Sequence, residues 1–229
     1  MKKIFTLVAA AMMAVGVNAQ KEWNFSNWTA AGYTATTTID GLTVYAAENP
    51  NDASKPYNVV VDASKKTIDE VKYTQRIKLG GSGGFEKDES QDPVVTYWDK
   101  PKYRVLAFDV TGDCDIYVAF AHASSSGDDR TLMIAKSDGT EIGTATVSAG
   151  QITSTTIKYT GAATTVFVYS KNSGINLYDL KWTLTQTGIS NITADKANAN
   201  APIYNLAGQQ VSKDFKGVCI QNGKKFINK

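Results

Sequence analysis

Side chains suited to catalysis are scarce in this sequence of 229 residues. There is one histidine, His122, and there are two cysteines, Cys114 and Cys219. A Ser–His or Cys–His nucleophile, or a histidine-based metal site, would have to use His122. No cysteine is near it in sequence, and the following segment, Ser124–Gly127, is typical of a turn. We therefore expect His122 to be structural and the protein not to be an enzyme.

Acidic residues are the next candidates, because two carboxylates facing a cleft can hydrolyse glycosidic bonds. Most aspartates fall in predicted turns, where Asp bonds its own backbone. Asp128–Asp129 and the acidic segment 86–92 offer hard oxygen ligands for Ca²⁺, but no spacing matches an EF-hand loop. A carboxylate-pair hydrolase and a calcium site stay open as alternatives, and we predict no catalytic residue, cofactor or metal.

Cationic and aromatic residues form a more promising set. Arg76 and Lys78 share one face of a predicted strand, Tyr73–Leu79, where they can meet an anionic ligand; Arg104 and Arg130 each begin a strand. The alternative is that these cations pair with neighbouring acids.

Tyr97, Trp98 and Tyr103 flank Pro101 in a long predicted loop, Gly80–Pro101. Exposed rings of this kind can stack on the apolar faces of sugars, or they can fold over the domain edge as a lid.

The elements that must position these residues are strands. Between Trp23 and Leu184, Thr, Val, Ile and Tyr dominate and Gly, Asp, Asn and Ser recur at short intervals. Alternation places Leu106, Phe108 and Val110 on one face, and similar runs follow. About ten such strands indicate an all-β, two-sheet antiparallel sandwich of jelly-roll type. Tyr178, Leu180 and Trp182 are expected to share one side of the last strand.

The chain divides into four predicted parts. Residues 1–19 have the charged start, apolar run and small-residue cleavage site of a signal peptide, and the run is shorter than a membrane span. Residues 20–184 form the sandwich, 185–201 a linker and 202–229 a short β-strand appendage. We expect an exported protein, extracellular or on the outer cell surface, with no transmembrane segment in the mature chain.

Overall charge and cysteine content narrow the class further. A net charge of +2 without a basic block argues against nucleic-acid binding. Cys114 and Cys219 fall in different predicted parts, so we expect two buried or half-buried thiols and not a disulfide.

Several segments taken together resemble a known type of module. The segments are Thr38–Tyr45, Tyr73–Gly83, Arg104–Gly112, Asp129–Leu132 and Tyr169–Tyr178, and the resemblance that they carry spans nearly all of residues 23–183. This set resembles the carbohydrate-binding-like β-sandwich modules attached to secreted bacterial pectate lyases. The resemblance implies a non-catalytic module with a polysaccharide or oligosaccharide partner. Arg76, Lys78 and Arg130 would then suit the carboxylates of an acidic plant or host polysaccharide, beside Tyr97, Trp98 and Tyr103.

The C-terminal residues carry a second resemblance. Ile203–Gln209, with Gly217–Val218 and Asn222–Lys225, is similar to the C-terminal sorting segments of type IX secretion cargo. The resemblance implies contact with secretion or surface-attachment machinery; the alternative is an appendage that packs on the sandwich. The rival to carbohydrate binding is a structural or adhesive surface protein with no glycan ligand.

Overall fold

The computed structural model describes residues 20–54, 56–185, 201–221 and 224–228. The chain forms two compact units that divide after Thr185, and each is described by itself below. The predicted signal peptide and most of the predicted linker lie outside the described residues, so both stay predictions.

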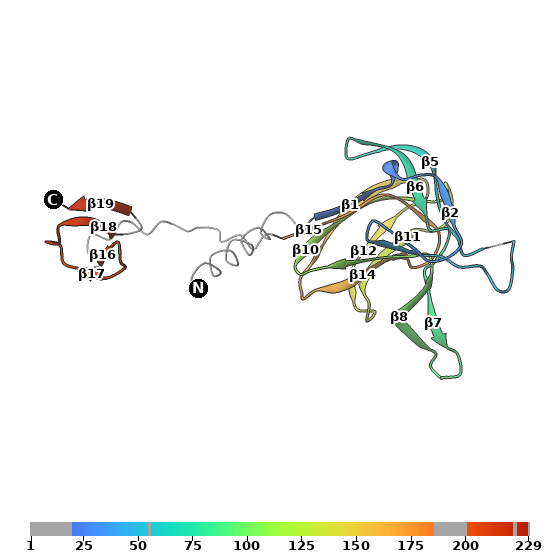
Figure 1. Cartoon of the computed structure of the whole chain (residues 1–229). Helices are drawn as coiled ribbons and strands as arrows, with labels where there is room; N and C mark the ends of the chain where they lie inside the picture. Colours follow the sequence, from blue (N-terminus) through green and yellow to red (C-terminus); the bar gives the residue numbers. More distant parts are fainter. Residues whose placement is uncertain (1–19, 55, 186–200, 222–223, 229) are drawn as a thin grey trace. The chain divides into compact units, whose positions relative to one another are not determined.

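The first unit is a sandwich of two antiparallel sheets, which confirms the predicted fold class (Figure 1). The seven-stranded sheet has the order β13-β10-β15-β6-β5-β2, with β1 paired to the end of β15. Its strands are β1 (Gln20–Asn24), β2 (Ala31–Tyr33), β5 (Val59–Ile68), β6 (Val71–Lys78), β10 (Cys114–His122), β13 (Ile152–Tyr159) and β15 (Ile175–Leu184). A single 3-10 turn, η1 (Phe25–Asn27), follows β1.

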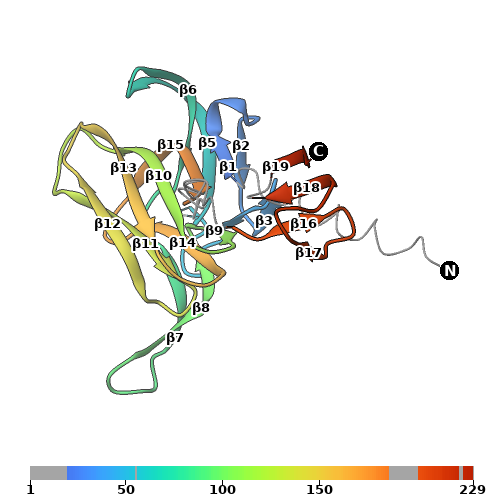
Figure 2. The ribbon, with the colours of Figure 1, turned by 90° about the vertical axis from the view of Figure 1, so that its left-hand side faces the viewer.

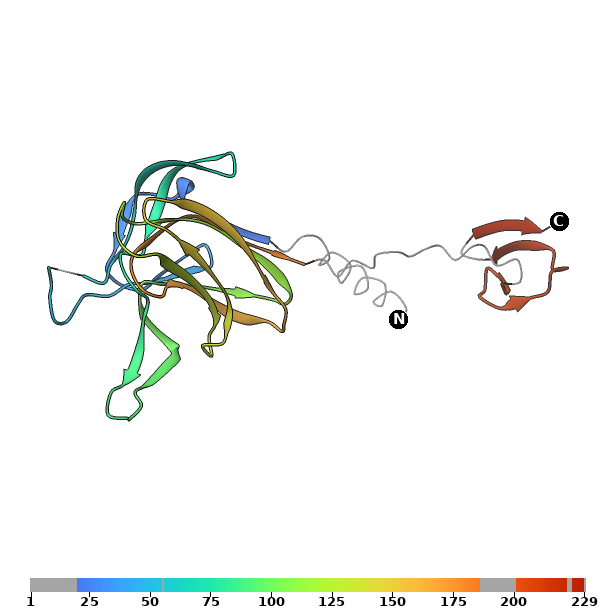
Figure 3. The same cartoon turned by 180° about the vertical axis from the view of Figure 1, so that it is seen from behind.

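The six-stranded sheet has the order β12-β11-β14-β9-β4-β3. Its strands are β3 (Thr37–Ile39), β4 (Leu42–Tyr45), β9 (Val105–Val110), β11 (Arg130–Lys136), β12 (Glu141–Val147) and β14 (Thr164–Ser170). The two sheets face each other, as Figure 3 shows from behind.

The main core lies between the sheets and is filled by alternate residues of each strand, because successive side chains of a strand point to opposite faces. The predicted set Leu106, Phe108 and Val110 is fully part of it, and so are Leu180 and Trp182. Burying a large apolar side chain contributes about 2 kcal/mol, so this layer is the main source of stability.

Tyr178 does not share the face of Leu180 and Trp182, so that expectation was wrong. The register between β10 and β15 shifts at Ala119/Phe120, which is a β-bulge that reverses the alternation. Tyr178 therefore belongs to a separate buried cluster that includes Tyr73.

The predicted long loop is in fact mostly a β-hairpin. Strands β7 (Gly84–Asp88) and β8 (Val95–Tyr103) pair with each other and not with either main sheet. The hairpin projects from the sandwich in both views of Figures 1 and 2. Tyr97, Trp98 and Tyr103 are thus strand residues, which fixes the direction of each ring.

The second unit is a four-stranded antiparallel sheet with the order β17-β16-β18-β19. Its strands are β16 (Ile203–Asn205), β17 (Gln210–Val211), β18 (Gly217–Gln221) and β19 (Lys224–Asn228). Cys219 and Ile203 are its buried apolar residues, whereas Leu206 and Ile227 are 63% and 68% exposed. So small a sheet buries little apolar surface, as the sequence predicted for the appendage.

Both cysteines are free and buried, as expected. Across the described ranges, no helix is long and apolar enough to cross a lipid bilayer.

Asp179 is a buried carboxyl group on β15. Its side chain is 4% exposed, Tyr73 donates a hydrogen bond to Oδ2 at 3.2 Å, and Oδ1 has no partner among the described residues. Burial, with the nearby charge of Glu22 second, raises the pKa of Asp179 from 3.8 to about 6. The folded protein therefore keeps a proton here that the unfolded chain releases near pH 4.

Stability should consequently fall as the pH rises from about 4 to 6, and Asp179→Asn should remove this loss. Between pH 4 and 7, the free energy of unfolding of the variant should rise by on the order of 2 kcal/mol relative to that of the wild type. The reason is that an amide is neutral at every pH, so its burial does not require a proton to stay bound. Urea unfolding at several pH values measures the difference. Asp115→Asn is the control, because Asp115 is exposed on the neighbouring strand β10. An effect of Asp179→Asn that does not depend on pH would contradict the raised pKa of Asp179.

Candidate functional site

The β7–β8 hairpin is anchored on the outer face of the six-stranded sheet. The ring of Phe85 packs against Phe167 and Tyr169 of β14, with ring centroids 5.9 and 5.1 Å apart. These rings belong to an apolar cluster on the face of β9, β11 and β14 that points away from the main core. The hairpin is therefore fixed at its base, and the inner face of the hairpin turns toward the sheet.

The two faces of the hairpin carry different side chains. Trp98 lies on the inner face, where its ring meets Phe85 edge-on at 5.0 Å. Tyr97 lies on the other face, with the Lys100 ammonium 4.6 Å from its ring centre and Lys100 paired to Glu86 at 3.0 Å. Trp98 and Tyr97 are nearly equally exposed, at 38% and 36%, although they point in opposite directions.

A second aromatic wall is built where β8 ends. Tyr103 stacks on Tyr57, with ring centroids 3.9 Å apart and an angle of 18°. The Tyr103 ring lies directly on Gly84, where any side chain would overlap it. Trp98 lies in the same way on Gly139 in the β11–β12 turn. Both rings are therefore held by contacts that only glycine permits.

Arg104 lies behind the tyrosine wall. Its guanidinium donates to the Pro56 carbonyl at 3.1 Å and is 5.2 Å from the Tyr57 ring centre. No ion pair among the described residues includes Arg104, and its Nε is buried without a partner there. Burial lowers the pKa of this guanidinium, but an arginine side chain stays protonated at neutral pH. A positive charge that no carboxylate of the described residues balances therefore lies behind the wall.

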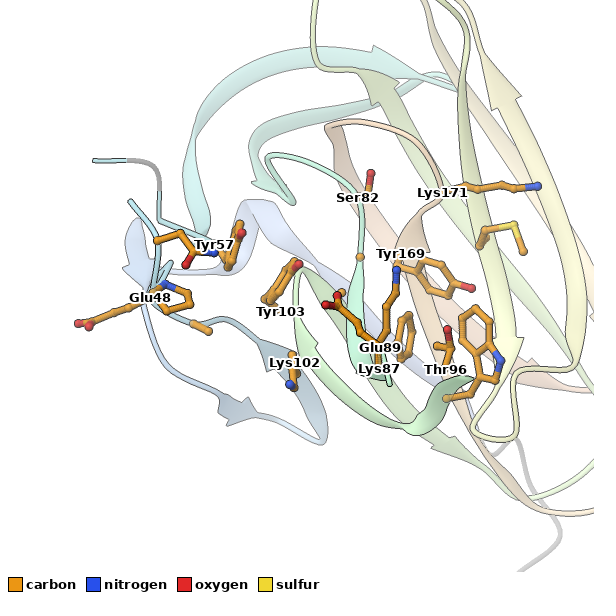
Figure 4. Close-up of a pocket in the computed structure, with 18 residues that line it drawn as sticks. Glu48, Tyr57, Ser82, Lys87, Glu89, Thr96, Lys102, Tyr103, Tyr169 and Lys171 are labelled. Carbon is orange, nitrogen blue, oxygen red and sulfur yellow. The ribbon is translucent and has the colours of Figure 1, made fainter. Parts of the chain in front are cut away.

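Together these walls enclose a cavity of about 930 Å³. Figure 4 shows Tyr57 and Tyr103 on one side and Tyr169 on the other, with Lys87 and Glu89 between them. The charged residues lining the cavity are Glu48, Lys87, Glu89, Lys102 and Lys171. None of the five has an ion-pair partner among the described residues. Rings with free polar groups at the rim are typical of small-molecule sites.

Of the six predicted ligand-binding residues, the structure brings Trp98 and Tyr103 to this cavity. The other four do not line it. Arg130, at the start of β11, donates a hydrogen bond to the Gly174 carbonyl, and Tyr97 points to the opposite side of the hairpin.

Arg76 and Lys78 share a face of β6, as predicted, but both bind Asp62 of β5. The two bonds are 2.8 and 2.9 Å long, one to each carboxylate oxygen. Burial alone would raise the pKa of Asp62, yet the hydrogen bonds from Arg76 and Lys78 outweigh it and the pKa is lowered. The alternative of pairing with an acid therefore describes these two cations, with Asp62 as the acid. Their binding of a ligand stays a prediction.

Four cavity residues were not singled out by the sequence: Tyr57, Lys87, Lys102 and Lys171. Tyr57 comes from the segment after β4, and it meets Tyr103 only through the tertiary fold. Lys87 and Lys102 lie on the hairpin, so a correct prediction of β7 and β8 would have placed them. Lys171 lies within Tyr169–Tyr178, a segment of the family resemblance, but nothing in the sequence marked it as a site residue.

His122 is a structural residue. It is 5% exposed, its Nδ1 accepts from the Ser124 N–H at 3.0 Å, and its Nε2 lies 3.0 Å from the Asp128 carbonyl. The ring therefore ties the β10 end to the loop that leads into β11. Within the described ranges, no three acidic, histidine or cysteine side chains gather as a metal site would require.

Comparisons with known proteins find similar structures but do not assign the chain to a family. No protein-family model matches the sequence, and no curated protein matches it. The cleaved adhesin domain K2 of Lys-gingipain is 14% identical, with a TM-score of 0.43, and 72% of this chain covers 98% of it. The carbohydrate-binding module CBM6cm-2 of lichenase 5A from Cellvibrio mixtus, in complex with cellotriose, is 14% identical with a TM-score of 0.31; the match covers 55% of this chain and 87% of that one.

An isomalto-dextranase from Arthrobacter globiformis T6, complexed with panose, is 12% identical with a TM-score of 0.33. The match covers 72% of this chain but only 32% of the isomalto-dextranase. All three TM-scores lie below 0.5, so the function has to be inferred from the residues of the chain itself.

Replacing Gly84 tests how the tyrosine wall is built. A methyl group at Gly84 overlaps the Tyr103 ring, so Gly84→Ala should displace the ring and destabilise the protein by about 1–3 kcal/mol. Thermal unfolding measures this change. Gly32→Ala is the matched control, because a methyl group there meets nothing within 4 Å. Equal effects of the two substitutions would contradict the close packing at Gly84.

Proposed function

We propose that this protein is a non-catalytic carbohydrate-binding β-sandwich, and that the sugar binds in the cavity between the β7–β8 hairpin and the six-stranded sheet. The observation that carries the proposal is the pair of aromatic walls, Trp98 on one side and Tyr57 with Tyr103 on the other. The C–H faces of a pyranose ring are apolar, and its hydroxyls form a polar rim. Flat aromatic rings beside free polar side chains complement both parts of such a ligand.

The walls are rigid before a ligand arrives. Trp98 is held by Phe85 and Gly139, and Tyr103 by Tyr57 and Gly84. Fixed rings lose little conformational entropy on binding, so more of the contact energy appears as affinity. This distinguishes the cavity from a patch of mobile surface aromatics.

The charges around the cavity favour an acidic polysaccharide. Its lining includes three lysines, Lys87, Lys102 and Lys171, against two glutamates, and the unbalanced cation of Arg104 lies behind the wall. Carboxylate or sulfate groups on a sugar would meet free ammonium groups here, whereas Arg76 and Lys78 are both already bound to Asp62. The preference for acidic sugars predicted from the sequence is therefore proposed again, with lysines of the hairpin in place of Arg76 and Lys78.

Trp98→Ala should weaken binding of an acidic oligosaccharide such as hexagalacturonate about 10-fold or more, because one stacking face is lost. Tyr97→Ala is the matched control: it removes an equally exposed ring from the opposite face of the hairpin and should leave affinity within about 2-fold. Isothermal titration calorimetry on both variants measures this. Unchanged affinity in Trp98→Ala, or an equal loss in Tyr97→Ala, would contradict the cavity as the site.

Ionic strength separates the acidic preference from carbohydrate binding in general. Raising salt from about 0.05 to 0.5 M should weaken hexagalacturonate binding several-fold, since the rim lysines are exposed to screening. Retention of no acidic or neutral glycan would instead favour an adhesive or structural role. Release of reducing ends or unsaturated products from pectin would contradict the non-catalytic assignment.

We also propose that the protein is exported and that residues 202–229 direct its sorting to the outer surface or medium. Support comes from the leader-like residues 1–19 and from the second unit, whose apolar Leu206 and Ile227 are available to another protein. Deleting residues 202–229 should leave the sandwich folded but retain it inside the cell envelope. Cell fractionation with an antibody to the sandwich measures this, and normal release of the truncated protein would overturn the sorting role.

A further inference from the structure

A second cavity, of about 480 Å³, lies at the seam where the two sheets end. β2 is the last strand of the seven-stranded sheet and β3 the last strand of the six-stranded sheet. They contribute Ala31, Tyr33 and Ile39 to the lining, and the segment from β1 through Thr29 supplies most of the rest. No residue lines both this seam cavity and the cavity beside the hairpin.

One wall of the seam cavity is the indole of Trp28, which the local fold holds in place. Asn24 caps η1 by accepting from the Ser26 N–H at 3.0 Å, and the Trp28 N–H donates to the Phe25 carbonyl at 3.1 Å. Gln75 of β6 donates to the Trp28 carbonyl at 2.6 Å.

The indole itself meets the fully buried Phe25 edge-on at 5.1 Å. The backbone of Trp28 is thus fixed by hydrogen bonds, and its half-buried ring is fixed by the contact with Phe25. The ring therefore presents a preformed surface to the cavity.

The polar groups of the seam cavity differ from those beside the hairpin. Asn27 and Thr29 are exposed there and make no side-chain hydrogen bond among the described residues. Glu22 and Asp40 add two carboxylates, and Asp40 is held by Lys21 at 2.5 Å. The lining includes no lysine or arginine, whereas the cavity beside the hairpin has three lysines.

We infer that the seam cavity is a second saccharide site and that it takes a neutral sugar. The ring of Trp28 offers a flat apolar face, the Asn27 amide both donates and accepts, and carboxylates accept from sugar hydroxyls. Asp40 is already paired with Lys21, but the lining has no cation to bind a uronate or sulfate group, and the Glu22 carboxylate repels such a group. The neutral preference is therefore the opposite of the one proposed for the hairpin cavity, and the seam site does not depend on that proposal.

Tryptophan indole N–H signals in a ¹⁵N-labelled full chain test this directly. The chain has four tryptophans, so the signals of Trp28 and Trp98 can be assigned with Trp28→Phe and Trp98→Phe. Neutral hexasaccharides of glucose, mannose, xylose and galactose, and hexagalacturonate, are titrated separately to about 10 mM, which detects millimolar affinity. The Trp28 signal should move with at least one neutral hexasaccharide and not with hexagalacturonate.

Asn27→Ala should weaken that neutral binding about 5- to 10-fold, because one hydrogen-bonding group is lost from an exposed position that folding does not need. Thr36→Ala is the control and should have no effect, because Thr36 is exposed in the nearby β2–β3 connection but does not line the cavity.

A Trp28 signal that moves with no neutral hexasaccharide overturns the seam site. Movement of Trp98 alone also overturns it while leaving the hairpin cavity supported. An equal response of Trp28 to hexagalacturonate overturns the neutral preference.

Discussion

Packing of the two sheets through alternate apolar side chains is the constraint on which the rest of the structure depends. Leu106, Phe108 and Val110 of β9 face the same layer as Leu180 and Trp182 of β15, and this layer fixes the spacing and register of both sheets. Because this layer stabilises the sandwich without disulfides, the connections between strands can vary in sequence and length while the fold is kept. The hairpin β7–β8 and the segment from η1 to Thr29, which joins β1 to β2, are such connections, and both candidate sites include residues from them.

The hairpin depends on a second, smaller apolar layer outside the six-stranded sheet. Phe85 packs there on Phe167 and Tyr169, so a two-stranded hairpin that would be marginal by itself acquires a fixed base. The rings that form the cavity walls then depend on this base. Tyr103 and Trp98 complete the arrangement by lying on glycines, where no side chain keeps them away.

Charge is distributed unevenly over this frame. On β6, Arg76 and Lys78 face a strand partner that carries Asp62, and both cations are bound to that carboxylate at 2.8–2.9 Å. Around the hairpin cavity, Lys87, Lys102 and Lys171 have no such partner among the described residues. The two sets of cations differ because only Arg76 and Lys78 lie opposite an acidic residue. An exposed cation is available to a ligand only where no acid lies opposite it. The seam cavity has the reverse imbalance, with acids and no cation in its lining.

The fold class could be predicted from the sequence, because the alternation of apolar residues depends only on the period of a strand. The structural role of His122 could also be predicted, because no cysteine is near it in sequence and the chain has no other histidine. The same local reasoning missed the bulge that turns Tyr178 to the other face, since a bulge is set by the pairing of β10 with β15.

The sites needed the tertiary structure for a similar reason. The sequence by itself determined that Trp98 and Tyr103 are large rings flanking Pro101, and that Arg76 and Lys78 share a face. Only the fold decided that Tyr57 stacks on Tyr103, that Asp62 binds both cations, and that Tyr97 points away from the cavity. Each of these outcomes rests on a contact between residues distant in the chain or on the register of a hairpin. Composition and spacing along one strand contain no information about either.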